Sequence, residues 1–254
     1  ISGSGIIIDP RGVILTNAHV AQYVLLGSRP EIGLSCSIRS GAPAQAKWKA
    51  DILYMPAAWV REHAEDITKS RPKGTGEHDY ALLLITKSAD SSLLPSEFPF
   101  LQVDTREAIG FTGDSVFLAG YPAEFSGGNS TRSSLYPSSV ISRIGDLLTF
   151  SDNSVDLISV GNVVLAQSGS SGGAVINTWG RLVGIISTTS EGATTADREL
   201  RAITLSYINR DLRQETGESL LNVLSGDVIS QAATFMREDA PQLAKQIISI
   251  LEDR

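Results

Sequence analysis

The sequence predicts an all-β fold, either a barrel or a sandwich, followed by a helical C-terminal extension. Across residues 6–203, short apolar runs rich in Val, Ile and Leu alternate with clusters of Gly, Pro, Ser and Asp, which is typical of short strands joined by turns. The 23 glycines and an aromatic content of only 6% also favour turns over long helices. After residue 207 the apolar residues recur at helical spacing instead.

Local composition locates the individual elements. Residues 5–8 and 13–15 are apolar and flank a turn in which Pro10 presets φ and Gly12 closes the bend. Residues 57–69 place apolar side chains at helical spacing and predict a helix. Further strands are expected at residues 80–85, 115–119, 147–150, 157–159, 173–176 and 182–187.

The C-terminal residues 207–254 are predicted to form helices with one apolar stripe. The stripe needs a partner, either the β-rich part of this chain or another copy of it. We expect docking on the chain's own β-rich part, with a homo-oligomer through these helices as the alternative. The residues of the stripe are Leu220, Leu221, Leu224, Val228, Ile229, Ala232, Leu243, Ile247, Ile248 and Leu251.

Composition excludes several classes of function. The 254 residues are 42% hydrophobic, enough for a sizeable core. The formal net charge is −7 and the sequence shows no basic patch of the kind that binds phosphate, so nucleic acid is not an expected partner. Cys36 is the only cysteine, which excludes a disulfide within the chain and a cysteine-based zinc site. Three histidines without a carboxylate cluster predict no metal site, and no apolar run reaches the roughly 18 residues of a membrane span. The chain opens inside an expected strand, so we expect a segment upstream, where an export signal or anchor would lie.

Residues 169–173, Gly-Ser-Ser-Gly-Gly, carry the first candidate for chemistry. Acyl transfer needs a nucleophilic oxygen beside backbone N–H groups that face the developing oxyanion, and flanking glycines let the backbone form such a turn. A Gly/Ser run alone is more typical of a flexible loop. This run, however, leads directly into two apolar strands, so we interpret Ser171 as a nucleophile embedded between core strands.

His19 and Asp79 are the other two candidates. His19 follows an apolar run, and because a histidine titrates near neutrality it can take up and return a proton. Asp79 opens a fully apolar strand, where a carboxylate needs a partner such as an imidazole N–H. Each residue alone has an ordinary structural interpretation. Their joint order, His19, Asp79 and then Ser171, favours a Ser-His-Asp triad and differs from the order in subtilisin and the α/β-hydrolases.

Five motifs in a common order resemble those of trypsin-like and HtrA serine peptidases. Residues 16–20, Thr-Asn-Ala-His-Val, are similar to the histidine motif, residues 79–83 to the aspartate strand, and residues 169–173 to Gly-x-Ser-Gly-Gly. Residues 113–122 resemble the strand that opens the second HtrA barrel, and residues 182–187 resemble the strand that lines the specificity pocket. The resemblance extends from about Gly3 to about Arg210.

This resemblance implies a double β-barrel of the chymotrypsin type, with six strands in each barrel and the active site in the cleft between them. The expected domains are residues 1–105, which carry His19 and Asp79; residues 106–206, which carry Ser171; and residues 207–254, a helical extension where HtrA proteins have a PDZ domain. A bacterial protein fits these features, exported or in the cell envelope, with the cytoplasm left open.

The resemblance also assigns roles at the site. Ser171 is expected to attack the peptide carbonyl, with His19 as general base and Asp79 orienting the histidine. The backbone of Gly169, Ser170 and Ser171 is expected to form the oxyanion hole. Trypsin has an aspartate at the position of Ser170, so activation by an N-terminal salt bridge is not available to this chain.

Four more residues are expected to bind substrate. Ser187, Thr188 and Thr189 would pair with the substrate main chain as an added strand. Leu165 would form the base of the specificity pocket, which favours a small or medium apolar side chain at P1, the substrate residue on the N-terminal side of the cleaved bond. Thr189, which stands where many relatives have glycine, would narrow that pocket further.

The leading hypothesis is a serine endopeptidase that hydrolyses peptides or unfolded proteins through an acyl-enzyme, without metal or organic cofactor. One alternative is a peptide-binding or scaffold module that retains a protease fold. Labelling of Ser171 by a fluorophosphonate would distinguish an enzyme from such a module. Another alternative is a protease that is latent until its C-terminal helices move, and the activity of a chain ending near Thr216, compared with that of the full chain, would test it.

Overall fold

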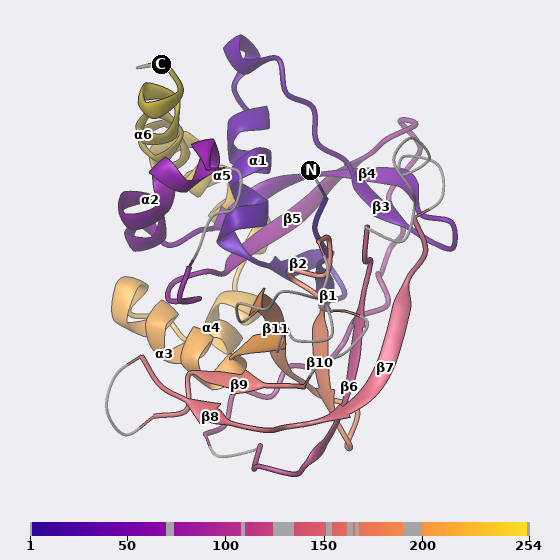
Figure 1. Cartoon of the computed structure of the whole chain (residues 1–254). Coiled ribbons are helices and arrows are strands. Elements are labelled where there is room, and N and C mark those ends of the chain that lie inside the picture. The colour runs from indigo at the N-terminus through magenta and orange to yellow at the C-terminus, as the bar shows by residue number, and fades with distance from the viewer. Residues whose placement is uncertain are drawn as a thin grey trace.

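The computed structural model describes residues 2–69, 74–107, 110–123, 135–150, 154–161, 165, 168–189 and 200–252, with the backbone alone at Thr188 and Thr189. Two β-sheets, built from antiparallel strand pairs, and a group of C-terminal helices make up this part of the chain (Figure 1). The expected all-β architecture with a helical extension is thereby confirmed.

The first sheet carries the histidine and aspartate of the candidate triad. Its five strands lie in the order β1-β2-β5-β4-β3, where the resemblance implied six strands. Two of them, β3 and β4, were not predicted, because Lys, Arg, Gln and Asp interrupt their apolar pattern. The strands are β1 (Ile6–Asp9), β2 (Val13–Thr16), β3 (Ile38–Ser40), β4 (Gln45–Tyr54) and β5 (Ala81–Ser88).

Both faces of β5 are covered, which explains its fully apolar sequence. Leu82 and Leu84 point into a core that also contains residues of the second sheet, whereas Leu83 and Ile85 point into a core formed with helices. Alternate residues of a strand face opposite sides of the sheet, so two cores require an uninterrupted apolar run. Helices, rather than a sixth strand, cover this sheet on the side away from its partner.

The second sheet carries the Gly-Ser-Ser-Gly-Gly turn, immediately before β10. Its seven strands lie in the order β7-β6-β10-β11-β12-β9-β8. Of these, β7 and β12 were not predicted, since polar residues break their apolar runs. The strands are β6 (Ser115–Gly120), β7 (Ser138–Arg143), β8 (Leu147–Leu148), β9 (Leu157–Ser159), β10 (Ala174–Asn177), β11 (Leu182–Thr189) and β12 (Leu200–Thr204).

Most of the helices lie beside the first sheet (Figure 1). Helix α1 begins directly after β2 and was not predicted, because its few polar residues do not mark a separate face. The predicted helix at residues 57–69 is present as α2 and the 3₁₀ helix η2. The helices are α1 (Ala18–Gly27), η1 (Pro30–Ile32), α2 (Ala57–His63), η2 (Ala64–Thr68), α3 (Leu205–Thr216), α4 (Leu220–Ser225), α5 (Val228–Glu238) and α6 (Ala240–Glu252).

The C-terminal helices pack on the chain's own sheets. Helix α3 lies against β11 and β12, α5 against β4 and β5, and α6 against α1, α2 and η2. Arg11, in the turn between β1 and β2, donates to the carbonyls of Leu224 and Gly226 at the end of α4. No helix among the described residues is long and apolar enough to cross a bilayer.

Part of the predicted apolar stripe faces solvent instead. Leu221, Ile229 and Leu251 are 54%, 70% and 40% exposed. The helical segment is broken at Gly226 and Asp239, and each break resets the direction in which the following residues point. A single spacing rule applied across the breaks therefore misplaces some side chains.

The docking of α5 can be tested by removing a buried aromatic ring. Phe235 is buried and its ring meets that of Tyr54 edge-on, 6.3 Å between centroids. We expect Phe235→Ala to lower the free energy of unfolding by about 3–5 kcal/mol, because the cavity cannot close between helix and sheet. Ile229→Ala, on the exposed side of the same helix, should change it by less than about 0.5 kcal/mol. Equal effects in urea denaturation would contradict this docking.

Candidate active site

His19 lies at the start of α1, at the point where the first sheet meets the second. Strand β2 ends at Thr16, Asn17 caps the helix with an extended backbone, and His19 is the second helical residue. The Asn17 side chain donates through Nδ2 to the backbone carbonyl of Asp79 at 2.9 Å. The abrupt passage from strand to helix therefore fixes the histidine beside the aspartate.

Asp79 stands just before β5, in a tight turn, with its carboxylate aimed at His19. The ring Nδ1 of His19 lies 2.8 Å from Oδ2 and 3.1 Å from Oδ1 of Asp79, and the backbone N–H of His19 donates to Oδ1 at 2.9 Å. Ser187 on β11 donates through Oγ to Oδ2 at 2.8 Å. An ionised carboxylate has no proton to donate, so Nδ1 of His19 must carry the hydrogen of this contact. Nε2 of the imidazole is then free to act as a base.

The electrostatics of the pair follow from burial and charge. Burial by itself lowers the pKa of His19, but the charge of Asp79 and its hydrogen bond outweigh burial and raise the pKa above the ordinary 6.5. Burial disfavours ionisation of Asp79, yet the contacts with His19 and Ser187 hold its pKa below the usual 3.8. The His19 side chain is still 37% exposed, so one edge of the ring is open to a substrate, whereas the Asp79 side chain is only 7% exposed.

Ser171 comes from the second sheet and lies close to the same residues. Its Oγ is 3.4 Å from the backbone oxygen of Ser187, the residue whose own hydroxyl holds Asp79. Among the described residues, Ser171 makes no hydrogen bond to His19. Asp79 and Ser171 thus both contact Ser187, His19 contacts Asp79, and the Ser171 hydroxyl is turned toward a carbonyl rather than toward the imidazole.

The turn that carries Ser171 is shaped for close backbone approach. Gly169 and Gly172 both have positive φ, and a Cβ at Gly172 would lie 2.1 Å from the oxygen of Ser4, so no other residue fits there. The N–H of Gly173 donates to the oxygen of Ser170. Within the part of the chain that the structure describes, the N–H groups of Gly169 and Ser171 donate to no acceptor.

Ser4 fastens this turn to the first sheet and was missed at the sequence level. Its N–H donates to the oxygen of Ser171 and its Oγ to the oxygen of Gly169, both at 2.7 Å. The same Oγ accepts the N–H of Tyr121 at 2.8 Å, and the Ser4 oxygen accepts the hydroxyl of Thr16 at 2.7 Å. The sequence around Ser4, a Gly/Ser run, does not indicate this role, because the hydrogen-bond partners of Ser4 come near it only when the two sheets pack together.

The expected substrate-binding residues lie in different settings. Leu165 is 1% exposed and belongs to the core of the second sheet, Ser187 is buried against Asp79, and Thr188 and Thr189 continue β11. The pairing of β11 with β12 is irregular between Ile186 and Thr189. The side chains of both threonines lie outside the described residues.

The two remaining histidines each pair with an aspartate. His63 contacts Asp66 at 2.9 Å, and His78 contacts Asp211 of α3 at 2.9 Å. Neither aspartate stood out in the sequence, since Asp66 lies among other charged residues and Asp211 on the polar face of a predicted helix. The described residues contain no group of three or more ligands that could hold a metal ion.

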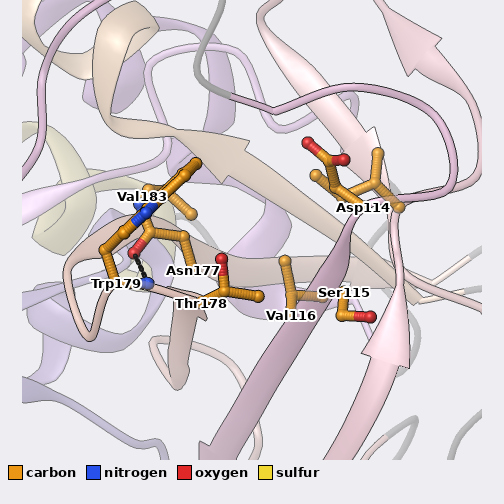
Figure 2. Close-up of a pocket in the computed structure, with 8 residues that line it drawn as sticks. Asp114, Ser115, Val116, Asn177, Thr178, Trp179 and Val183 are labelled. Carbon is orange, nitrogen blue, oxygen red and sulfur yellow. Dashed lines mark hydrogen bonds between the residues drawn. The ribbon is translucent and has the colours of Figure 1, made fainter.

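A separate cavity of about 220 Å³ lies at the far end of the second sheet. Figure 2 shows Asp114 on one side of it and Asn177, Thr178 and Trp179 of the β10–β11 turn on the other. None of the candidate triad lines this cavity. We therefore treat it as independent of the site between the sheets.

Comparison with protein families matches residues 3–185 to the model of the trypsin-like peptidase domain. A comparison with curated protein sequences finds no match. Among solved structures, the MamO protease domain from Magnetospirillum magneticum (apo form) is 18% identical, with 83% of this chain and 87% of that chain covered and a TM-score of 0.48. Rv3671c from M. tuberculosis, a serine-to-alanine mutant in an inactive form, is 18% identical, with 85% and 82% covered and a TM-score of 0.49.

The matched family segment spans well over half of the chain and includes His19, Asp79 and Ser171. It runs across both sheets, from just before β1 to the first residues of β11, the strand that carries Ser187. The two sheets and the C-terminal helices accordingly form a chymotrypsin-like double β-barrel with a helical extension. This chain belongs to the trypsin-like peptidase family.

Proposed function

We propose that this protein is a serine endopeptidase that cleaves peptide bonds through an acyl-enzyme. The observation that carries the proposal is the short contact between His19 Nδ1 and the buried carboxylate of Asp79, with Ser171 supplied from the other sheet beside Ser187. In a buried site, a carboxylate that fixes the tautomer of an accessible imidazole prepares that ring to accept a proton.

A named residue of this chain can then perform each step of the reaction. The Ser171 hydroxyl rotates away from the Ser187 carbonyl toward His19, gives its proton to Nε2, and attacks the substrate carbonyl. The charge that develops on the substrate oxygen meets the free N–H groups of Gly169 and Ser171. His19 returns the proton to the leaving amine, and water then repeats the sequence to release the acyl group.

The resting direction of the Ser171 hydroxyl favours a second candidate, a protease that is latent until its site rearranges. The hydroxyl is 3.4 Å from a carbonyl and is not bonded to the imidazole. Hydrogen bonds at catalytic sites commonly lengthen without substrate and tighten with it. The rate of Ser171 modification in the full chain separates these two states.

The proposed substrate preference depends on Leu165, which the resemblance to trypsin-like peptidases assigns to the base of the specificity pocket. A side chain buried in the core of the second sheet offers no charge to a basic residue of the substrate. We propose that the enzyme prefers a small or medium apolar residue at P1, and that Ser187, Thr188 and Thr189 pair with the substrate main chain.

The proposed function gives three predictions, and the first concerns the nucleophile. The 254-residue chain should react with a fluorophosphonate at Ser171 and cleave members of an unbiased peptide library, preferentially after small apolar residues. Ser171→Ala should abolish both, while Ser142→Ala, on β7 of the same sheet, should change neither. A folded protein that neither reacts nor cleaves would refute the active enzyme and leave the latent protease or a peptide-binding module.

The second prediction concerns pH. His19 must be neutral to act as a base, and its pKa is raised, so kcat/KM should rise with pH through a midpoint above about 6.5. Asp79→Asn removes the charge that raises this pKa, so the midpoint should move down. The same change should lower kcat by about 10⁴-fold, because the tautomer is no longer fixed. An unmoved midpoint in the pH-rate profile would show that Asp79 does not control His19.

The third prediction concerns Ser4. Removing its hydroxyl leaves the oxygen of Gly169 and the N–H of Tyr121 without a partner in a buried place. We expect Ser4→Ala to lower the free energy of unfolding by about 1–3 kcal/mol. Gly169 is then held less firmly, so kcat should fall by about tenfold or more. This loss should be smaller than the loss of kcat that follows removal of an oxyanion-hole donor.

The matched control for Ser4→Ala is Ser142→Ala. The Ser142 hydroxyl also donates to a backbone oxygen, that of Val160 at 2.6 Å, but it lies away from the nucleophile turn. It should lower stability without lowering kcat. Comparable losses of kcat in both variants would mean that Ser4 acts only through global stability.

A further inference from the structure

The residue before Asp79 has an unusual backbone. His78 has φ of 56°, and among the described residues only Ser91 is a second non-glycine with positive φ. The left-handed region is unfavourable for a histidine and persists only where surrounding contacts hold it. The carbonyl of His78 accepts the N–H of Tyr80 at 2.9 Å, which closes a tight turn centred on Asp79.

Helix α3 supplies the contacts that hold His78. The Tyr207 hydroxyl accepts the backbone N–H of His78 at 3.0 Å, and Asp211 Oδ1 lies 2.9 Å from Nδ1 of the His78 ring. Tyr207 and Asp211 are four residues apart, so they project from one face of the helix. Both side chains are buried, and the helix is fixed at its start by Thr204, whose hydroxyl accepts the N–H of Tyr207.

The ring of His78 and the carboxylate of Asp211 form an ion-pair contact. Nδ1 lies 2.9 Å from Oδ1, although the geometry of the contact falls outside that of a hydrogen bond. The contact with Asp211 raises the pKa of His78 above the ordinary 6.5 despite partial burial, and the carboxylates of Glu62 and Glu77 act in the same direction. Tyr54, Tyr80 and Tyr207 also interact electrostatically with the buried Asp211.

We propose that Tyr207 and Asp211 of α3 are positioning residues, which hold His78 in its left-handed conformation and so keep the Asp79 carboxylate aimed at His19. This inference rests on the proposed peptidase function and extends it, because it makes the geometry of the triad depend on the first helix after the second sheet. Asp79 also has backbone contacts of its own: its N–H donates to the carbonyl of Gly76, and its carbonyl accepts from Nδ2 of Asn17.

Three substitutions in the full-length protein test the link. His78→Asn keeps a residue that tolerates left-handed φ but removes the imidazole. Asp211→Asn removes the charge, and Tyr207→Phe removes the acceptor for the His78 N–H. Each should lower kcat by about tenfold or more with KM unchanged, because a small displacement of a catalytic group costs rate rather than substrate binding.

The chain contains a matched control pair. His63 and Asp66 are also 2.9 Å apart and similarly buried, but they lie on α2 and η2 and contact no residue of the site. His63→Asn and Asp66→Asn should reduce stability without a change of more than about twofold in kcat. The double variant His78→Asn with Asp211→Asn should be no worse than either single variant, since both break one contact.

A second readout does not require activity. The chain has three histidines, and the ring of each can be titrated by NMR in the Ser171→Ala protein. If Asp79 swings away, the pKa of His19 should fall in His78→Asn, Asp211→Asn and Tyr207→Phe, and stay unchanged in the two control variants. Unaltered kcat and an unaltered His19 titration in His78→Asn and Asp211→Asn would overturn the inference, as would equal losses in the control variants.

The two proposals can fail separately. A wild-type protein that does not cleave peptides would refute the peptidase function, while the His19 titration would still decide whether α3 positions Asp79. A wild-type protein that cleaves peptides, together with an unmoved His19 pKa in the variants, would refute only the positioning role.

Discussion

The buried carboxylate of Asp79 joins segments that are far apart in the chain. It accepts two N–H groups from His19 and a hydroxyl from Ser187, while its backbone oxygen accepts from Asn17. An ionised carboxylate taken out of water is costly unless such donors surround it. Asn17 and His19 lie at the start of α1, directly after β2 of the first sheet, and Ser187 lies on β11 of the second. The sheets must therefore pack in one relative position for the charge to be tolerated. Stability and the geometry of the candidate site are consequently set by the same contacts.

The same junction is fastened from two other directions. On the side of the nucleophile turn, Ser4 bridges Gly169, Ser171 and Thr16 through side-chain and backbone hydrogen bonds. On the side of Asp79, helix α3 holds the residue that precedes the carboxylate. Groups on which catalysis depends must be held by neighbours whose own conformations are locked, and here those neighbours are buried. The proposed positioning role of α3 is an extension of this arrangement.

The C-terminal helices also complete the first sheet. Helices α5 and α6, together with α1 and α2, form a core on the face of the sheet turned away from its partner. The apolar surface of β4 and β5 would otherwise face water. The helical extension is thus part of the fold that presents His19 and Asp79, and a change within it reaches the site through packing as well as through the contacts of α3 with His78.

Local patterns in the sequence predict the fold class and the family, and they single out His19, Asp79 and Ser171 as candidates for the site. Apolar runs between turn residues indicate strands because alternation and turn chemistry are local properties, and the order of the His19, Asp79 and Ser171 motifs is readable along the chain. Elements with interrupted apolar patterns, such as β4 and β7, gave too little local signal. Helix α1 was missed because its burial, not its periodicity, stabilises it.

The side chains that support the site are apparent only in the folded chain. Ser4, Asp211 and Tyr207 are ordinary polar residues in sequence, and their partners lie at distances along the chain that no local pattern encodes. The direction of the Ser171 hydroxyl and the extra core built by α5 and α6 are likewise products of packing. Local propensity is fixed by neighbouring residues, whereas contacts between buried polar groups exist only after the two sheets and the helices have come together.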